Sequence, residues 1–312
     1  MDIDRRSVLK GLAAAATALT VAPTPAQARE RRTAPPDAVG LLYDTTLCIG
    51  CKACVVACKE ANGMPADTDN YGGGLYDAPD DLNETTRNII QFYEGDEGEQ
   101  SFVKRQCMHC VDPGCVGACM LGALQKREFG IVTWDPDLCI GCRYCQVACP
   151  FNVPKFEWSK KAPKIVKCEL CNHRLREGKL PACAEVCPRH AVIFGNYADL
   201  LDEAHRRLDE HPDQYVPKVY GEHDLGGTQC LYLSHVPFEE LGFRFDSTEP
   251  VPEVQQTLQH GLYQGFAAPL ALYGLLGAVM FRNRRARRAE DEDKDGDKTG
   301  IDHEPPRPAG PN

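Results

Sequence analysis

Seventeen cysteines stand in this sequence, and sixteen of them fall into four motifs of four. The most regular motif runs from Cys139 to Pro150 and reads C-x2-C-x2-C-x3-C-P. Three thiolates at this spacing can wrap around one [4Fe–4S] cube, while the fourth, a helical turn further on, points away and ligates a second cube. The motif therefore predicts an iron–sulfur cluster and requires a partner motif.

The stretch from Cys48 to Cys58 repeats this spacing. Asp44–Cys51 and Asp135–Cys142 agree at six of eight positions, which indicates internal duplication. The first copy has Lys59 where the other has proline.

Two further motifs are less regular. The one from Cys107 to Cys119 has a longer middle gap with a turn at Asp112-Pro-Gly. The one from Cys168 to Cys187 has an eleven-residue gap, and by itself would also fit a zinc ribbon. After three cluster motifs we interpret it as a fourth.

The ligand count suffices for four cubes and leaves Cys230, which we expect to be a buried structural thiol. Because each fourth cysteine crosses to a neighbouring cube, the motifs must work in pairs. Adjacent pairing (first with second, third with fourth) and nested pairing (first with fourth, second with third) both satisfy the ligand count. The spacing does not decide between them.

Composition limits the class of protein. The 312 residues carry a formal net charge of −10, which argues against a nucleic-acid partner. So many cysteines leave a disulfide scaffold, a zinc protein or an iron–sulfur protein. We find no nucleophile elbow, Rossmann fingerprint or paired acid/base motif, so we expect electron transfer without catalysis. The alternative of a different class is a zinc- or disulfide-stabilised scaffold without redox function.

The N-terminus predicts an export signal. Arg5-Arg6 precedes a short alanine-rich apolar run and an A-x-A site that ends at Ala28, so residues 1–28 are typical of a twin-arginine signal peptide. This route exports folded proteins, and clusters can therefore be inserted before the thiols meet an oxidising compartment.

The remaining chain divides into segments. We expect strands over 39–43 and 130–134 and a four-cluster domain over 39–200. Residues 59–106 form an insertion, loop-like up to residue 100, with a flexible triple glycine at 72–74 and a solvated acidic turn at 94–99. A C-terminal extension over 201–257 follows.

The C-terminus predicts a membrane anchor. Residues 258–281 have the length and apolar character of a bilayer-spanning helix, and the arginines from Arg282 to Arg288 form a positive stop on the cytoplasmic side. The cluster domain would then lie in the periplasm and the disordered tail 282–312 in the cytoplasm, as the signal also predicts. A buried helix in a soluble core is the alternative. His260 is interpreted as an interfacial histidine.

All four motifs together resemble the four-cluster electron-transfer subunits of bacterial membrane oxidoreductases, a family that includes iron–sulfur subunits of formate dehydrogenase-N, dimethyl sulfoxide reductase and hydrogenase-2. The resemblance covers about residues 39–245. It implies an α+β fold, a duplicated bacterial ferredoxin-like domain holding four cubane clusters, plus the one C-terminal transmembrane helix.

The resemblance also implies nested pairing and four [4Fe–4S] clusters, since no cysteine is missing. The implied ligand sets are Cys48, Cys51, Cys54 with Cys187; Cys168, Cys171, Cys183 with Cys58; Cys107, Cys110, Cys115 with Cys149; and Cys139, Cys142, Cys145 with Cys119.

Within this family, Gly226–Ser234 and Val236–Phe238 look most like the hydrogenase-2 subunit. The resemblance implies partners of three kinds: periplasmic catalytic subunits, an integral membrane quinone-reacting subunit and the lipid bilayer. The catalytic partner is expected to be a [NiFe] hydrogenase (large and small subunits). The alternative is the alpha subunit of a formate dehydrogenase or another molybdopterin oxidoreductase.

Two groups near the motifs have open roles. Because four cysteines fill the demand of one cube, we expect His109 to lie behind the ligands or at the surface. Basic residues near the motifs either raise cluster potentials or are ordinary surface charges; they are Lys52, Lys59, Arg143, Lys167 and Arg189.

Overall fold

A computed structural model describes residues 32–66, 79–96, 98–243, 247–252 and 272–285. Residues 28–256 form one unit, which contains all seventeen cysteines, and residues 1–27 with 257–312 form a second. The predicted signal peptide, the triple glycine and His260 lie outside the described residues.

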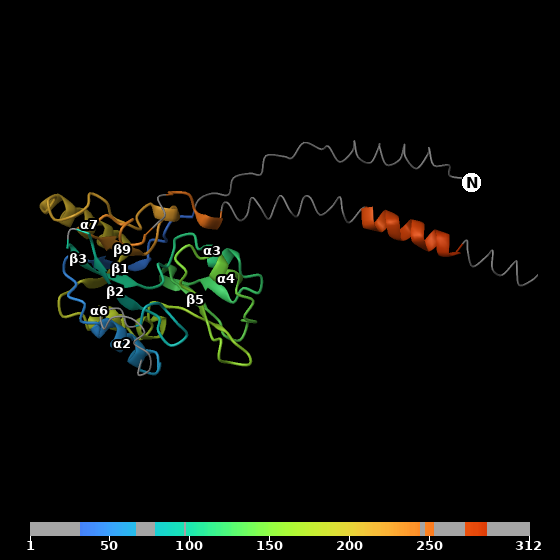
Figure 1. The fold of residues 1–312 in the computed structure, drawn as a ribbon, viewed down its shortest axis with the longest axis horizontal. Coiled ribbons are helices and arrows are strands. Elements are labelled where there is room, and N and C mark those ends of the chain that lie inside the picture. Colours follow the sequence, from blue (N-terminus) through green and yellow to red (C-terminus); the bar gives the residue numbers. More distant parts are fainter. Residues whose placement is uncertain (1–31, 67–78, 97, 244–246, 253–271, 286–312) are drawn as a thin grey trace, which may run out of the picture. The chain divides into compact units, whose positions relative to one another are not determined.

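The main sheet is centred on β1 (Val39–Asp44), where the sequence predicts a strand over 39–43 (Figure 1). β1 pairs antiparallel with β8 (Val192–Asn196) and parallel with β9 (Cys230–Leu233). A central strand covered on both faces needs a nearly continuous apolar run, and β1 supplies one.

The two faces of β1 pack against different parts of the chain. Leu41 and Tyr43 face the core that contains cysteines of the motifs. Leu42 faces the other way, against Leu200 of helix α7 (Tyr197–Glu210). β1 therefore joins the cluster motifs to the C-terminal part of the unit.

Each motif holds its third cysteine in a helix. These helices are α2 (Ala53–Ala61), α3 (Gly114–Gly117), α4 (Tyr144–Val147) and α6 (Ala182–Glu185). α4 and α6 end shortly before Pro150 and Pro188, because proline lacks an N–H and disfavours helical backbone in the preceding residue. α2 has Lys59 at that position and runs on to Ala61. The two glycines of α3 lower its helix propensity, so it is also short.

Two strand pairs bring the motifs together two by two. β1 precedes the first motif and pairs with β8, which follows the fourth. β5 (Val132–Trp134) precedes the third motif and pairs antiparallel with β4 (Leu124–Lys126), which follows the second. In agreement, α2 packs against α6 and α3 packs against α4. The backbone thus places the first motif beside the fourth and the second beside the third.

The expectation of a loop over residues 59–100 is wrong for its second half. β2 (Ile89–Glu94) and β3 (Gln100–Arg105) form an antiparallel hairpin, and Ile90 and Val103 pack in the main core. The acidic stretch forms the hairpin turn, and its described carboxylates are exposed, as predicted. Tertiary packing gives this segment a structure that its polar composition obscured.

Smaller elements complete the unit. β6 (Lys155–Phe156) pairs with β7 (Ile165–Val166) between the third and fourth motifs, and α5 (Asn172–Leu175) lies in the long gap of the fourth. Single turns of 3₁₀ helix occur at Glu128–Gly130 and Asp224–Gly226.

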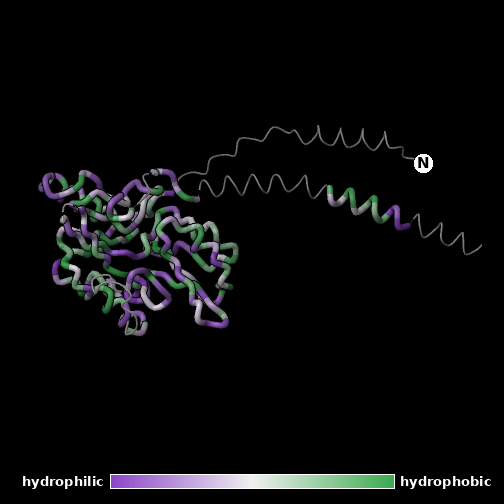
Figure 2. The backbone as a smooth tube through the Cα atoms, in the orientation of Figure 1, coloured by the Kyte–Doolittle hydropathy of each residue, from purple (hydrophilic) through white to green (hydrophobic). Residues whose placement is uncertain are grey.

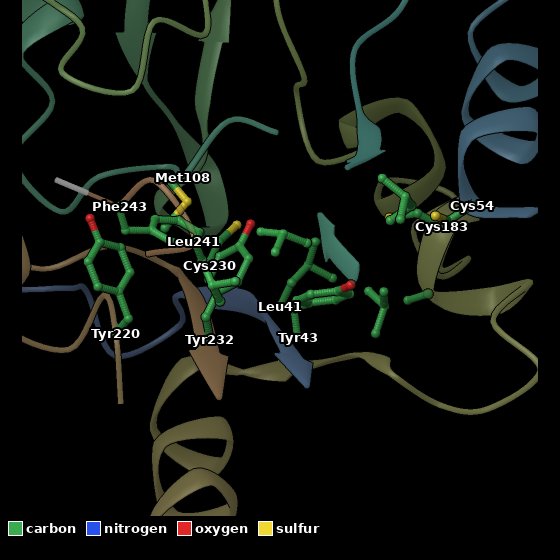
Figure 3. Packing of buried hydrophobic residues seen from close by; sticks show 14 of the residues in the cluster. Leu41, Tyr43, Cys54, Met108, Cys183, Tyr220, Cys230, Tyr232, Leu241 and Phe243 are labelled. Carbon is green, nitrogen blue, oxygen red and sulfur yellow. The ribbon is translucent and has the colours of Figure 1, made fainter. Parts of the chain in front are cut away.

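Aromatic residues of the C-terminal extension close the core (Figure 3). The rings of Tyr220 and Phe243 lie 4.6 Å apart, and Tyr232 of β9 lies 5.1 Å from Phe243 and 5.4 Å from Tyr43 of β1. Aromatic pairs at such separations contribute beyond the area that they bury. The extension is thus part of the same core as β1.

Residues 272–285 are helical and exposed, and Figure 2 shows that the apolar part of this helix gives way to a polar end, where Arg282, Arg284 and Arg285 stand. The predicted membrane segment 258–281 lies only partly within the described residues. Among these residues, no helix combines the length and the apolarity that a bilayer crossing needs.

A buried carboxylate anchors the end of β1. Asp44 is 0% exposed and accepts hydrogen bonds from Arg207 Nη1 (2.9 Å), Tyr215 Oη (2.8 Å) and the Thr46 backbone N–H (3.0 Å). Removing one partner of a buried ion pair leaves an uncompensated charge, which is more damaging than losing a surface pair.

We therefore expect Arg207→Ala to lower the free energy of unfolding by about 3 kcal/mol. The neighbouring Arg206 side chain is 52% exposed, so Arg206→Ala should change the free energy of unfolding by less than about 0.5 kcal/mol. Anaerobic denaturant titrations followed by circular dichroism measure both. Equal effects of the two substitutions would contradict the anchoring role of Asp44.

Candidate iron–sulfur cluster sites

The four motifs share one backbone turn. In each, the residue directly before the second cysteine has a positive φ: Gly50 (67°), His109 (48°), Gly141 (70°) and Leu170 (52°). Left-handed residues of this kind aim successive backbone N–H groups at one point, and such nests favour anions, iron–sulfur clusters among them. The turn explains why two residues separate the first two cysteines in every motif.

The first set of thiols combines the first motif with the end of the fourth. Cys48, Cys51, Cys54 and Cys187 line one small cavity of about 20 Å³. Burial raises the pKa of the Cys54 thiol, Lys104 partly offsets this, and the other three thiols raise it further.

The second set is Cys58, Cys168, Cys171 and Cys183. Burial raises the pKa of the Cys168 thiol well above its usual value, and the other three thiols of the set add to the shift. This set joins the fourth cysteine of the first motif to the first three of the fourth motif.

The third set is Cys107, Cys110, Cys115 and Cys149. Burial raises the pKa of the Cys110 thiol strongly, and the other three thiols raise it further. Here the last cysteine of the third motif joins the first three of the second.

The fourth set combines the last cysteine of the second motif with the first three cysteines of the third. Cys119, Cys139, Cys142 and Cys145 line a cavity of about 70 Å³. Burial and then the other three thiols raise the pKa of Cys145 to about 12. Iron binds thiolates, so loading each set must displace these protons.

The four sets follow one another in series. Cys54 of the first set acts on the pKa of Cys183 in the second. Cys107 of the third acts on Cys168 of the second, and Cys145 of the fourth acts on Cys115 of the third. Neighbouring sets are therefore in electrostatic contact in the order first, second, third, fourth.

Only two cysteines are exposed, and they lie at the two ends of this series. Cys51 belongs to the first set and Cys142 to the fourth, whereas every cysteine of the second and third sets is buried or half-buried. Fully exposed thiols therefore occur only in the first and the fourth set.

All seventeen cysteines are free thiols, so the structure has none of the bonds that a disulfide scaffold requires. The described residues also contain no group of three or more His, Cys, Asp or Glu side chains that is spaced to hold a single metal ion. Each cysteine of a cube binds a different iron atom at its own corner. Cube ligands therefore lie farther apart than the ligands of one zinc ion, whose sulfurs are all about 2.3 Å from the metal.

His109 provides an independent test of the fit of a cluster. It is 0% exposed, so it lies behind the ligands and not at the surface, the other location expected from the sequence. Its Nδ1 accepts the backbone N–H of Val132 at 3.2 Å, while its Nε2 is buried and has no hydrogen-bond partner among the residues that the structure describes. With Nδ1 as acceptor, Nε2 carries the proton. His109 stands between Cys107 and Cys110 in sequence, and a sulfur atom of a cluster bound there would be a suitable acceptor for this unpaired N–H.

The basic residues near the motifs fall into two groups. Arg143 and Arg189 are exposed and Lys52 is half-buried, whereas Lys59 and Lys167 are buried. Sequence reasoning missed Lys104, which is 0% exposed on β3. It stands three residues before Cys107, between the segment expected to be a loop and the second motif, and nothing in the cysteine spacing indicates that it is buried.

Cys230 has the structural role that the sequence predicts. It is 0% exposed in β9, receives a hydrogen bond from Gln106 Nε2 at 3.6 Å and donates to the carbonyl of Cys107 at 3.3 Å. Its thiol holds the backbone of a predicted ligand in place.

Comparison with known proteins identifies a 4Fe-4S domain in this chain. The model of a 4Fe-4S dicluster domain matches residues 99–197, a range that contains the second, third and fourth motifs. The hydrogenase-2 operon protein HybA of Escherichia coli O157:H7 is 37% identical over 97% of this chain and 100% of its own length.

Formate dehydrogenase subunits are also similar. The nitrate-inducible iron–sulfur subunit of Escherichia coli K12 is 36% identical over 76% of this chain and 81% of its own length. The formate dehydrogenase-O iron–sulfur subunit of the same strain is 35% identical over 88% and 86%.

The turn geometry predicts the effect of a single methyl group. A Cβ at Gly141 would lie 2.4 Å from the carbonyl oxygen of Pro163, whereas one at Gly178 would meet nothing within 4 Å, although both residues have positive φ. Gly141→Ala should therefore distort the turn of the fourth set and lower the iron content from about sixteen to about twelve atoms per chain. Gly178→Ala introduces the same backbone strain without the steric clash, and it should retain the full iron content. Iron analysis of anaerobically purified protein distinguishes the two outcomes, and equal iron in both variants would contradict the role of the turn.

Proposed function

Because the chain belongs to the family of iron–sulfur electron-transfer subunits that includes HybA, we propose that its four thiol sets hold four [4Fe–4S] clusters in one conducting series. Each cluster, when bound, takes up and passes on single electrons. The observation that carries the proposal is geometric: paired strands bring the motifs together two by two, and the four thiols of the first set and the four of the fourth each line one small cavity.

The ligands follow from the four sets. The first set would hold one cluster with Cys48, Cys51, Cys54 and Cys187, and the other sets would hold theirs likewise. The nested strand pairing and the two lined cavities support these assignments. The protein's part is to fix the spacing of the clusters and to keep water from the inner two.

The two ends of the series are suited to different partners. Large apolar side chains are exposed around the first set, at Ile49, Val56 and Val186. A larger group is exposed around the fourth: Met120, Leu121, Leu138, Ile140, Tyr144 and Val147. Clustered exposed apolar side chains mark interaction sites. We place a partner protein over each end, where electrons enter and leave.

We also propose which end of the series faces the membrane. Val251 lies against Gly114 of α3, so that a Cβ on Gly114 would come within 3.0 Å of its side chain. The predicted membrane segment begins a few residues later, at 258. The third and fourth sets would then face the membrane-embedded, quinone-reacting subunit, and the first set the catalytic subunits.

The location of the protein is also part of the proposal. The twin-arginine pattern, the apolar segment 258–281 and the arginines after it support export of the folded protein and anchoring in the cytoplasmic membrane, with the cluster domain in the periplasm and the C-terminus in the cytoplasm.

For the catalytic partner we propose the large and small subunits of a [NiFe] hydrogenase. The similarity to HybA extends over nearly the whole of both chains, and that to the formate dehydrogenase subunits over less of this one. The second candidate is a formate dehydrogenase or another molybdopterin oxidoreductase, since those subunits are almost as similar in identity.

The cluster count can be tested on the full chain purified without oxygen. We expect a brown protein, visible absorbance that bleaches with dithionite, and about sixteen iron atoms per chain. Cys142→Ser and Cys110→Ser should each remove one cluster signal from the electron paramagnetic resonance (EPR) spectrum of the reduced protein. A colourless chain that contains zinc would establish the scaffold alternative instead.

The partner can be identified from membranes of the native host. A C-terminally tagged chain, solubilised in mild detergent, should co-purify with hydrogenase subunits and a membrane subunit, and dihydrogen should reduce its clusters. Reduction by formate without dihydrogen would favour the second candidate. Recovery of the tagged chain in the soluble fraction would contradict the membrane anchor.

A further inference from the structure

Two lysines are enclosed at the junctions of the thiol sets. Lys104 is 0% exposed and Lys167 is 1% exposed. Lysine is almost never fully buried unless it is paired, because an ammonium group loses its hydration in the interior. Their neighbours therefore indicate what compensates the two charges.

Lys104 lies between the first and second sets. Its Nζ donates to Asn88 Oδ1 at 2.7 Å, and Asn88 Nδ2 donates to the backbone carbonyl of Cys54 at 3.4 Å. Burial alone would lower the pKa of Lys104. Nearby thiols of both sets act in the opposite direction and raise the pKa of Lys104; they are Cys54 of the first set and Cys58, Cys168 and Cys183 of the second.

Lys167 occupies the next junction. Its Nζ lies 4.0 Å from the Sγ of Cys107 in the third set and donates at 2.8 Å to the backbone carbonyl of Cys168 in the second. A further hydrogen bond runs to the carbonyl of Val132, the residue whose N–H His109 accepts. Lys167 is thus held in place by three acceptors: the Sγ of Cys107 and the carbonyls of Val132 and Cys168.

The charges of bound clusters explain why ammonium groups belong here. A cube with four cysteinates is negatively charged and becomes more so on reduction. A nearby positive charge stabilises the reduced form and raises the potential, and net charge is one of the factors that set cluster potentials. In a low-dielectric interior this effect is larger than at the surface. An ammonium between two cubes also screens their mutual repulsion.

We propose that Lys104 and Lys167 act as positioned charges that raise the potentials of the clusters on either side of them. Lys104 would act on the clusters of the first and second sets, and Lys167 on those of the second and third. The inference rests on the proposed four-cluster function. It names two residues that ligate no iron but set how readily the inner clusters accept an electron.

EPR-monitored redox titration of the purified full chain tests this. Lys104→Gln retains a donor for Asn88 but removes the charge, and it should lower two cluster potentials by about 59 mV each, which is tenfold in the equilibrium constant for one electron. Lys167→Gln should also lower two potentials, and one cluster should be common to both variants. In the double variant the potential of the shared cluster, that of the second set, should fall by the sum of the two single shifts. The potential of the fourth set's cluster should not change in any variant.

Matched controls separate charge from packing. Lys179 belongs to the fourth motif but is 58% exposed, so Lys179→Gln should leave every potential unchanged. Lys104→Arg and Lys167→Arg keep the charge and should stay near the wild-type potentials. Loss of clusters in the Gln variants with retention in the Arg variants would equally support a requirement for charge.

Three results would overturn the inference. One is unchanged potentials in Lys104→Gln and Lys167→Gln at full iron content. Another is an equal shift of all four clusters, and the third is loss of clusters in the Gln and Arg variants alike. In each case a wild-type chain with about sixteen irons and four titrating signals would leave the proposed function intact. A wild-type chain without them would refute the proposed function itself.

Discussion

The structure depends on one constraint: the fourth thiol of each motif faces a different set from the first three. The first three cysteines surround one point, and the fourth, on or just after the same short helix, is directed away from it. A motif alone therefore cannot complete a set of four ligands. The chain must fold so that two motifs lie side by side with their helices in contact, as α2 does with α6 and α3 with α4. Strand pairing meets this requirement, because the strand before one motif of each pair joins the strand after the other.

How much of this the sequence predicts depends on the range of the interaction involved. Local patterns predicted the four motifs, the strand at β1 and the buried thiol of Cys230. Motif pairing was not decidable from the residues, since both pairings use every cysteine. The choice lies in contacts between residues far apart in the chain, such as Leu41 with Phe194, and the family resemblance, not the spacing, indicated it. The β2–β3 hairpin was missed because its acidic turn dominates the composition of that segment.

Lys104 illustrates the same limit for the electrostatics. The chain as a whole is acidic, with a formal net charge of −10, and this charge describes the surface. The interior is different: it places ammonium groups among thiols that become anionic when iron binds. The amino-acid composition adds the charges of the surface and the interior together, so it does not reveal the positive charges that lie in the interior. Lys104 stands three residues before the second motif and belongs to no recognisable pattern. It acquires its proposed role only because the β2–β3 hairpin brings it near Cys54 and Cys183.

The exposure of the thiols follows from the same arrangement. With four sets in series, each inner set has a neighbour on two sides, and the chain covers what remains. The end sets have one neighbour each, so one thiol at each end, Cys51 and Cys142, stays exposed. These two are equivalent positions of the duplicated motifs, the second cysteines that directly follow Gly50 and Gly141. Duplication and nesting together therefore place the same turn at both ends of the series, facing outward. The apolar side chains around each exposed turn then differ between the ends, and this difference would let an internally repeated chain distinguish the two partners that we propose.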